Sequence, residues 1–217
     1  LVGGSLARAL GRAGLRVALV EALGTAARSQ PSYDERVLAL SWGSRRILEA
    51  MGLWDDLAPG AEPICRVHVS DRGHFGFVHL DGAEEGVPAL GYVAPARLIA
   101  QAIQAQLDRV DIFCPARLLG FHLQEDRVEV EVASGGESQL LSAALLVAAD
   151  GGDSAIRQRL GFDALERGYG HDAIITTVTP DRPQPGVAFE RFTDTGPLAL
   201  LPMTEGRYSV VWTARET

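Results

Sequence analysis

The chain has 217 residues, of which 47% are apolar, and its formal net charge is −8 at pH 7. This length allows one large domain or two small ones with a substantial hydrophobic core. No apolar run approaches the ~18 residues that a membrane-spanning helix needs, and the first residues do not resemble a secretory signal. The acidic balance argues against a nucleic acid as a partner.

The basic and sulfur-containing residues exclude further classes of chemistry. All twenty basic residues are arginine, a bias that fits a GC-rich genome, so neither a lysine Schiff base nor a Walker phosphate loop is available. Cys65 and Cys114 stand far apart without a CxxC motif, which favours a reducing compartment and a cytoplasmic location. The five histidines show no metal-ligand spacing, so we expect no metal site.

The first sixty residues follow an α/β pattern. Small residues predict a helix over 3–13, and the apolar run RVALVE (16–21) predicts a strand of a parallel sheet. After a polar loop over 23–35, the sequence SWGSRRILEAMGLWDDL (41–57) predicts a helix closed by Gly52. The buried stripe that we expect on this helix consists of Ile47, Leu48 and Met51.

From residue 64 the hydrophobic period changes to two. CRVHVSD and FGFVHLD predict a hairpin. PARLIAQAIQAQLDRV (95–110) predicts a helix with Pro95 in its first turn. The later segments alternate or are apolar, and we expect strands at ARLLGFHLQ, RVEVEVA, QLLSAALLVAAD, HDAIITTVTP, GVAFERFT, GPLALLP and RYSVVWTA, with a short helix at SAIRQRLG.

This order of elements indicates a mixed α/β (α+β) fold built from discontinuous segments. We expect one α/β domain from residues 1–63 and 95–163, and a β-rich domain from residues 64–94 and 164–217.

The opening stretch LVGGSLARALGRAGLRVALVEA (1–22) resembles the second part of a dinucleotide-binding βαβ unit. Glycines there let the backbone approach a pyrophosphate at a helix N-terminus, and an acid after the second strand binds a ribose. Gly3 matches the third glycine of G-x-G-x-x-G, and Glu21 matches the acid. We therefore expect the first strand and two glycines to lie upstream. The alternative is a core helix that begins with glycine.

A second strand-to-helix turn occurs at VAADGGDSAIRQRLG (147–161). An apolar strand ends at Asp150-Gly151, and Asp153 or Ser154 can cap the following helix. A phosphate would be repelled by Asp150, so its carboxylate more plausibly accepts a hydroxyl hydrogen bond or organises the turn. The alternative is an ordinary strand–helix turn without a ligand.

Together the two stretches resemble one family. This family is the FAD-dependent aromatic hydroxylases of the para-hydroxybenzoate hydroxylase type. Its second fingerprint, DGxxSxxR, is matched by Asp150, Gly151, Ser154 and Arg157. What remains of its first fingerprint is matched by Gly3 and Glu21. YDERVLALSWGS (33–44), FGFVHLDGAEEGVPALGYV (75–93) and FERFTDTGPLALLP (189–202) are similar to the ubiquinone-biosynthesis branch, of 2-octaprenyl-6-methoxyphenol hydroxylase type. The resemblance covers essentially the whole chain.

The resemblance implies an FAD-binding dinucleotide fold with an interleaved β-sheet substrate domain. It implies FAD contacts from Gly3, Glu21, Asp150 and Gly151, from the side chains of Arg36 and Arg97, and from the backbone of Leu118, which would meet the adenine. A surface ion pair is the alternative for either arginine. The family's third fingerprint, a GD motif, should follow the β-rich segment, and the sequence stops at Thr217 before it. We therefore expect the chain to be truncated at both ends.

The activity that the resemblance implies is hydroxylation of a polyprenylated phenol in ubiquinone biosynthesis, using FAD, NAD(P)H and O₂. No catalytic side chain stands out. GPLALLP offers an apolar wall for a prenyl tail, or plain core packing. A prenylated substrate also implies peripheral membrane contact, and other quinone-biosynthesis proteins are candidate partners.

Three alternatives remain open. One is a reductase of the same fold that acts on isoprenoids. A second is a nicotinamide dehydrogenase, which would not be a yellow flavoprotein. The third is a non-catalytic subunit or fragment that no longer binds FAD.

Overall fold

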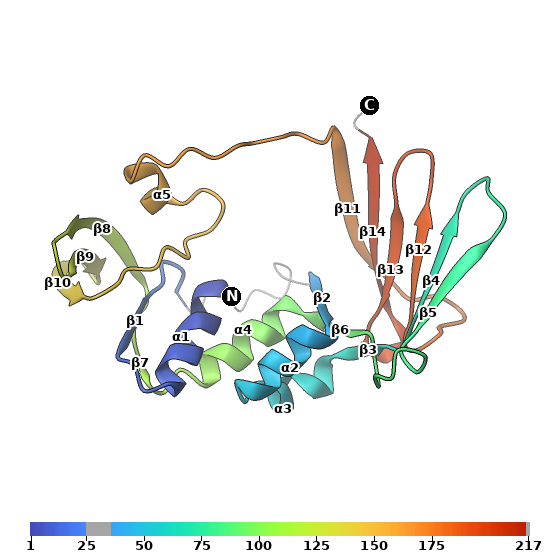
Figure 1. The fold of residues 1–217 in the computed structure, drawn as a ribbon, viewed down its shortest axis with the longest axis horizontal. Coiled ribbons are helices and arrows are strands. Elements are labelled where there is room, and N and C mark those ends of the chain that lie inside the picture. Colours follow the sequence, from blue (N-terminus) through green and yellow to red (C-terminus); the bar gives the residue numbers. More distant parts are fainter. Residues whose placement is uncertain (25–35, 216–217) are drawn as a thin grey trace. The chain divides into compact units, whose positions relative to one another are not determined.

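The computed structural model describes residues 1–24 and 36–215 (Figure 1). The contacts divide the chain into two compact units. The first unit is made of Leu1–Tyr33 and Ile103–Leu165, and the second of Asp34–Ala102 and Glu166–Thr217. These bounds differ from those of the expected domains, because residues 34–63 and 95–102 group with the β-rich segment. The assignment of a function to each domain stays a prediction.

A helix and two parallel strands open the first unit. Helix α1 (Val2–Arg12) leads into β1 (Val17–Val20), and β1 pairs in parallel with β7 (Val110–Phe113). The buried face of α1 includes Ala7 and Gly11, whose small size allows close packing. The expected helix and the expected strand of a parallel sheet are both confirmed.

The second sheet of the first unit is an antiparallel meander in the order β10-β9-β8. Its strands are β8 (Ala116–Leu123), β9 (Val128–Ser134) and β10 (Glu137–Ala143). Valines at alternate positions of β9 form the buried core with Ala116. A two-residue turn, Gly135-Gly136, joins β9 to β10. Both glycines have positive φ, 61° and 88°, as a type I′ turn requires.

One strand is shorter than the sequence predicts. The apolar run was expected to continue as strand to Asp150, but β10 ends at Ala143. Within residues 1–24 and 36–215, no strand pairs with residues 145–149, and the Leu145 side chain is exposed. An apolar run predicts a strand only where a neighbouring strand accepts its backbone hydrogen bonds. The short helix α5 (Ala155–Arg159) follows.

A six-stranded sheet forms most of the second unit, in the order β11-β14-β13-β12-β4-β5. Neighbours are antiparallel except β12 and β4, which are parallel. The expected hairpin and the four expected C-terminal strands are confirmed. The strands are β4 (Arg66–Asp71), β5 (Phe77–Asp81), β11 (His171–Val178), β12 (Val187–Phe192), β13 (Leu198–Pro202) and β14 (Tyr208–Arg215), with the 3₁₀ turn η3 (Thr204–Gly206) before β14.

A smaller antiparallel sheet, β2-β6-β3, adjoins the large one. Ile64 and Val93 of the small sheet pack with Ala188 of the large sheet and with Met203, which follows β13, in one buried cluster. None of the three short strands of this sheet was predicted from the sequence. The elements of this part are β2 (Val37–Ser41), α2 (Trp42–Ala50), α3 (Trp54–Leu57), η2 (Ala58–Gly60), β3 (Glu62–Ile64), β6 (Gly91–Pro95) and α4 (Ala96–Ala105).

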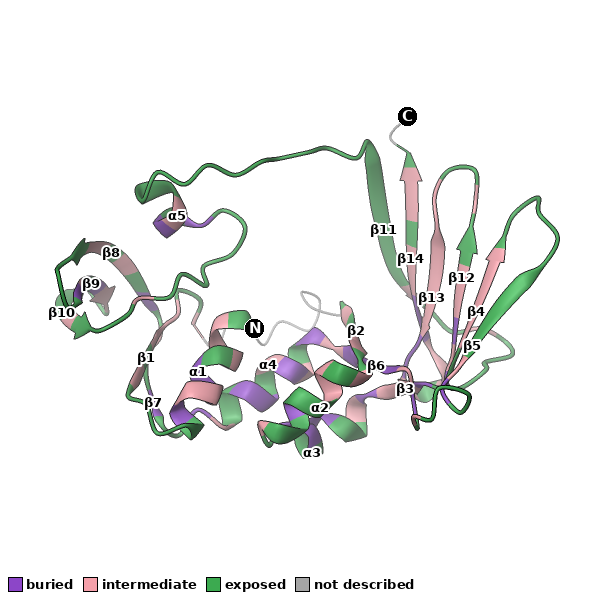
Figure 2. Ribbon diagram, in the orientation of Figure 1, coloured by how far each residue is buried: buried purple, intermediate pink, exposed green. Residues whose placement is uncertain are grey.

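The helix expected over 41–57 is two helices. The chain turns at Gly52, whose φ of 72° favours glycine, and α3 continues in a new direction. Leu48 is buried as expected, but Ile47 is 63% exposed. Little of α2 is buried (Figure 2). The expectation for Ile47 was wrong because the buried residues after the turn, Leu53 and Leu57, supply the packing instead.

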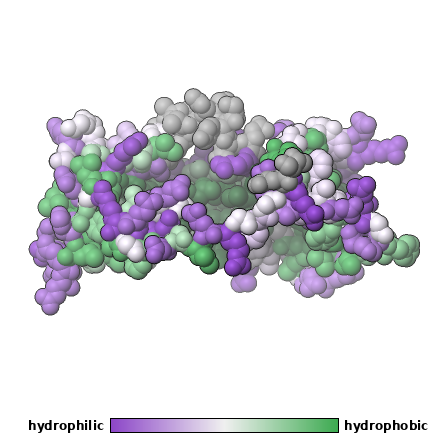
Figure 3. Space-filling view, turned by 90° about the horizontal axis from the view of Figure 1, so that it is seen from above, coloured by the Kyte–Doolittle hydropathy of each residue, from purple (hydrophilic) through white to green (hydrophobic). Residues whose placement is uncertain are grey.

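Hydrophobic side chains also reach the surface in both units, interleaved with polar ones (Figure 3).

Candidate functional site

Helix α1 approaches the end of the unpaired segment 145–149 very closely. A Cβ atom built on Gly3 would lie 3.1 Å from the Cβ atom of Ala149 and 3.9 Å from Leu19 Cδ1. A Cβ atom on Gly4 would lie 3.0 Å from Ile103 Cγ2. Side chains rarely come this near, so glycine at both positions allows the helix to pack here. Close helix–strand packing is the task of the third glycine in a dinucleotide-binding turn.

The Asp150 carboxylate holds the turn that follows Ala149. Its Oδ2 accepts a hydrogen bond from the Ile156 backbone N–H at 3.3 Å. The Ser154 hydroxyl also hydrogen-bonds to it, and this bond is the main reason why the pKa of Asp150 lies below its usual value. Asp150 therefore stays ionised at neutral pH. Through these bonds within the chain it organises the turn, and a role toward a ligand stays a prediction.

Ser154 and Arg157 complete the turn. Ser154 is the N-cap of α5, and its Oγ accepts a hydrogen bond from the Arg157 N–H at 3.1 Å. Arg157 Nη1 donates to the Gly152 carbonyl at 2.7 Å. Among the residues that the structure describes, nothing accepts a hydrogen bond from the buried Arg157 Nε. Gly151 has a φ of 93°, and the space where its Cβ would lie is open. The turn thus has open space beside the Gly151 backbone and, at Arg157 Nε, a buried donor without an acceptor among the described residues.

Glu21 lies directly after β1, as expected. Its backbone N–H donates to Phe113 O at 2.9 Å, and its carbonyl accepts from the Ala116 N–H at 2.8 Å. The carboxylate Oε1 accepts a hydrogen bond from the Leu23 N–H at 3.0 Å, which fixes its direction. The neighbouring residue Ala22 lines a cavity of about 250 Å³ with residues 115–117, 119 and 133–136.

Leu118 lies on β8 beside this cavity wall. Its side chain is half-buried and packs against the valine core of the meander. The strand is irregular between Leu118 and Gly120, which interrupts the regular pairing of the backbone there. Gly3, Glu21, Leu118, Asp150 and Gly151 all belong to the first compact unit.

Arg36 and Arg97 belong to the second unit, and there they are neighbours. The Arg36 carbonyl accepts a hydrogen bond from the Ala96 N–H at 2.9 Å, next to Arg97. Antiparallel pairing of β2 with β6 places both arginines at one end of these strands, and both residues are exposed. In the described part of the chain, no carboxylate forms an ion pair with Arg97.

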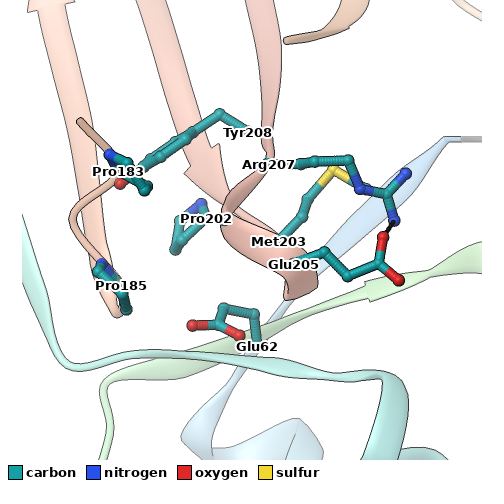
Figure 4. Close-up of a pocket in the computed structure, with 9 residues that line it drawn as sticks. Glu62, Pro183, Pro185, Pro202, Met203, Glu205, Arg207 and Tyr208 are labelled. Atoms are coloured by element: carbon teal, nitrogen blue, oxygen red, sulfur yellow. Dashed lines mark ion pairs between the residues drawn. The ribbon is translucent and has the colours of Figure 1, made fainter. Parts of the chain in front are cut away.

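The second unit also holds a polar cavity that the sequence did not indicate (Figure 4). Its volume is about 230 Å³. Burial raises the pKa of Glu62 and of Tyr208, and the Glu62 charge raises that of Tyr208 further. Glu205 forms an ion pair with Arg207 at 3.2 Å. The cavity is lined by Glu62, Pro183, Pro185, Pro202, Met203, Glu205, Gly206, Arg207 and Tyr208.

The described residues contain no cluster of three or more metal-ligating side chains. In the same ranges, every helix is too short or too polar to cross a bilayer.

Comparison with known proteins identifies the family of the chain. The model of the FAD binding domain family matches residues 1–217. The chain is 37% identical over 218 residues to the ubiquinone hydroxylase UbiL of Rhodospirillum rubrum, covering 99% of this chain and 50% of the relative. It is 30% identical over 219 residues to the 3-demethoxyubiquinol 3-hydroxylase of Escherichia coli K12, covering 98% of this chain and 54% of the relative.

Solved structures show the same fold. The Klebsiella pneumoniae protein HpxO, complexed with FAD and uric acid, matches with a TM-score of 0.77 and 20% identity, covering 99% of this chain and 54% of HpxO. The chain spans about half the length of the curated relatives that it matches. The mixed α/β class and the dinucleotide-binding fold are confirmed, and the chain belongs to the FAD binding domain family.

Proposed function

We propose that the whole protein is an FAD-dependent monooxygenase that hydroxylates a polyprenylated phenol in ubiquinone biosynthesis, using NAD(P)H and O₂. The observation that carries the proposal is the contact of Gly3 with Ala149, because it brings the two fingerprint turns together in one unit. The similarity to a ubiquinone hydroxylase and to a 3-demethoxyubiquinol 3-hydroxylase supports the substrate class.

The residues of the first unit fit FAD. Helix α1 has 11 residues, and a backbone N-terminus of this kind favours the charge of a pyrophosphate. The Glu21 carboxylate suits a ribose, and the open space at Gly151 lets a polar group of the cofactor approach the backbone closely. The Leu118 backbone is the proposed adenine contact. Arg36 and Arg97 remain proposed FAD ligands on the family resemblance and on their exposure.

The cofactor held by these residues would supply the redox chemistry of the reaction, namely acceptance of a hydride from NAD(P)H and activation of O₂. The task of this chain is to bind and orient that cofactor, and Asp150 acts by holding the 150–157 turn in shape. We assign no side chain as acid or base. The proposal includes peripheral contact with a membrane, because a prenylated phenol partitions into the bilayer.

FAD binding is tested first, with the natural protein. Purified protein should be yellow, and Glu21→Gln should weaken FAD binding about tenfold, since a hydrogen bond to an ionised carboxylate is replaced by a weaker one to a neutral amide oxygen. Glu125→Gln, in an exposed turn, is the control and should bind FAD as the natural protein does. A protein that stays colourless and resists reconstitution with FAD would instead be a non-catalytic subunit.

The reaction is tested next. NAD(P)H oxidation and O₂ uptake should both increase on addition of a prenylated phenol, and mass spectrometry should find one added oxygen in the product. Reduction of an isoprenoid double bond without O₂ uptake would favour the reductase alternative. Deletion of the gene should accumulate the prenylphenol that the protein uses, which identifies the ring position.

A further inference from the structure

The outer edge of the six-stranded sheet exposes an aromatic hairpin. All ten residues 71–80 are exposed, and they form the end of β4, the turn and most of β5. Figure 2 shows β5 exposed along almost its entire length. We call residues 72–80 the hairpin tip.

The hairpin tip is rich in large apolar side chains. Phe75 in the turn is fully exposed, and Phe77 is 64% exposed. Val78 and Leu80 are also exposed. Successive side chains of a strand point to opposite faces, so apolar groups lie on both faces of β5. A protein partner that packed on one face would leave the other face in water, whereas insertion into a bilayer surface would cover both.

The hairpin tip carries one formal positive charge, that of Arg72, and no negative charge. Its sequence, RGHFGFVHL, contains no carboxylate, although the chain has 28 acidic residues. Arg72 and the two histidines, His74 and His79, are its polar groups. Asp71 precedes the tip and pairs with His74 at 2.7 Å. An arginine next to exposed apolar side chains can lay its apolar stem along the lipid while its charged head stays at the headgroup level.

The hairpin is held in a defined conformation, so the phenylalanines are presented by a rigid element. Arg66 forms two hydrogen bonds with Asp81 Oδ2, at 2.9 and 2.7 Å. His68 Nδ1 and His79 Nε2 share a hydrogen bond of 2.8 Å. The Arg72 N–H donates to Phe192 O at 2.9 Å, which ties the turn to β12.

We propose that the hairpin tip inserts shallowly into the surface of an anionic phospholipid bilayer. Phe75 and Phe77 contact the lipid, and Arg72 binds lipid phosphates. This inference rests on the proposed function, because a membrane-resident substrate gives the contact its purpose.

Vesicle binding of the natural protein tests the inference. Vesicles of phosphatidylglycerol with phosphatidylcholine should retain the protein, and pure phosphatidylcholine should retain less. The double variant Phe75→Ser with Phe77→Ser should bind the anionic vesicles at least about tenfold more weakly, because two large apolar side chains are lost. Ile47→Ser is the matched control, since Ile47 is 63% exposed on α2, and it should bind normally.

A second readout locates the contact. Brominated lipid should quench the added fluorescence of Phe75→Trp and leave that of Ile47→Trp unchanged. Equal vesicle binding by the double variant, or no binding by the natural protein, overturns the proposal. Self-association that depends on the two phenylalanines, without vesicle binding, also overturns it.

Hydroxylation of a short-chain, water-soluble phenol separates this inference from the proposed function. The double variant should keep that activity. Hydroxylation without vesicle binding would contradict the membrane contact and leave the proposed function standing. Vesicle binding without hydroxylation would contradict the proposed function and leave the membrane contact standing.

Discussion

Gly3 packs against Ala149, the residue directly before Asp150, with only 3.1 Å between a Cβ atom built on Gly3 and the Cβ of Ala149. Two motifs that lie far apart in the sequence thus meet in one compact unit. An arrangement on opposite sides of the molecule would have removed the basis for a shared cofactor site. The cofactor roles of the individual residues stay predictions. The role of Gly3 can be tested by a substitution that disturbs this close contact.

Gly3→Ala should destabilise the protein, because the added methyl group would overlap Ala149. We expect the free energy of unfolding to fall by about 1 kcal/mol and FAD binding to weaken. Gly43→Ala is the matched control, because Gly43 also occupies the second position of its helix and its Cβ would lie 3.7 Å from Ser41 Oγ. That change should stabilise by up to about 1 kcal/mol through helix propensity. Chemical denaturation measures both, and equal stabilisation by the two changes would contradict the close packing.

Ser154→Ala should remove the cap of α5. The expected loss is about 1 kcal/mol, the usual effect of deleting an N-cap hydroxyl, and the pKa of Asp150 should rise because its main hydrogen bond disappears. NMR titration of the Asp150 carboxyl measures the second effect. Ser154→Thr should keep both properties, and Ser138→Ala on exposed β10 should change neither. An unchanged Asp150 titration in Ser154→Ala would refute this account of the turn.

The sequence predicted the elements that carry their own local signal. The alternating hairpin, the four C-terminal strands and the Gly3-to-Glu21 unit all follow from periodicity and turn residues. The three strands of the β2-β6-β3 sheet did not, because each has only three to five residues and gains its stability from pairing with segments far away in sequence. Arg36 and Arg97 come together only through this pairing, so no local pattern predicts that they are neighbours.

Arg8 shows what the periodicity of a helix hides. Leu6 and Leu10 lie four residues apart, a spacing that predicts a shared apolar helix face, but Leu6 is exposed and Arg8 is buried. Arg8 Nη2 donates to Gln106 Oε1 at 2.7 Å, and Nη1 pairs with Asp108 at 3.3 Å. A charged residue is expected at the surface from sequence, and only the tertiary partners make its burial possible.

Arg8→Ala should therefore destabilise the first unit. Loss of the buried hydrogen bonds should lower the free energy of unfolding by about 1–3 kcal/mol. Asp108 is largely exposed, so its ion pair with Arg8 should account for only a small part of this loss of stability. Arg12→Ala, at the exposed end of the same helix, is the control and should change stability by less than about 0.5 kcal/mol. Similar effects of the two changes in thermal unfolding would show that Arg8 is not anchored by these partners.

Glu205→Gly should stabilise the turn between β13 and β14. Glu205 has a φ of 64°, the one positive value at a non-glycine position among the described residues. The left-handed conformation disfavours a side chain by roughly 1–2 kcal/mol, and the ion pair with Arg207 is too exposed to offset this. Glu205→Gln removes the ion pair and keeps the strain. Stability should rise only in Glu205→Gly, and an equal rise in both variants would point to the charge instead.

Glu62→Gln should stabilise the protein at neutral pH and not in acid. Burial raises the pKa of Glu62 above its ordinary value of 4.5, so the folded chain keeps this proton at pH values where the unfolded chain has released it. The stability of the natural protein therefore falls as the pH rises from 4.5 through the raised pKa. Glutamine cannot ionise, and the variant should gain stability relative to the natural protein only above pH 4.5.

Denaturation curves across a pH series measure this difference, with two other glutamates as references. Glu190 also has a pKa raised by burial, so Glu190→Gln should shift stability in the same direction. Glu84→Gln, at an exposed turn, should leave the pH profile unchanged. A gain for Glu62→Gln that is as large below pH 4.5 as at neutral pH would mean that the amide packs better, and that desolvation of the carboxylate is not the cause.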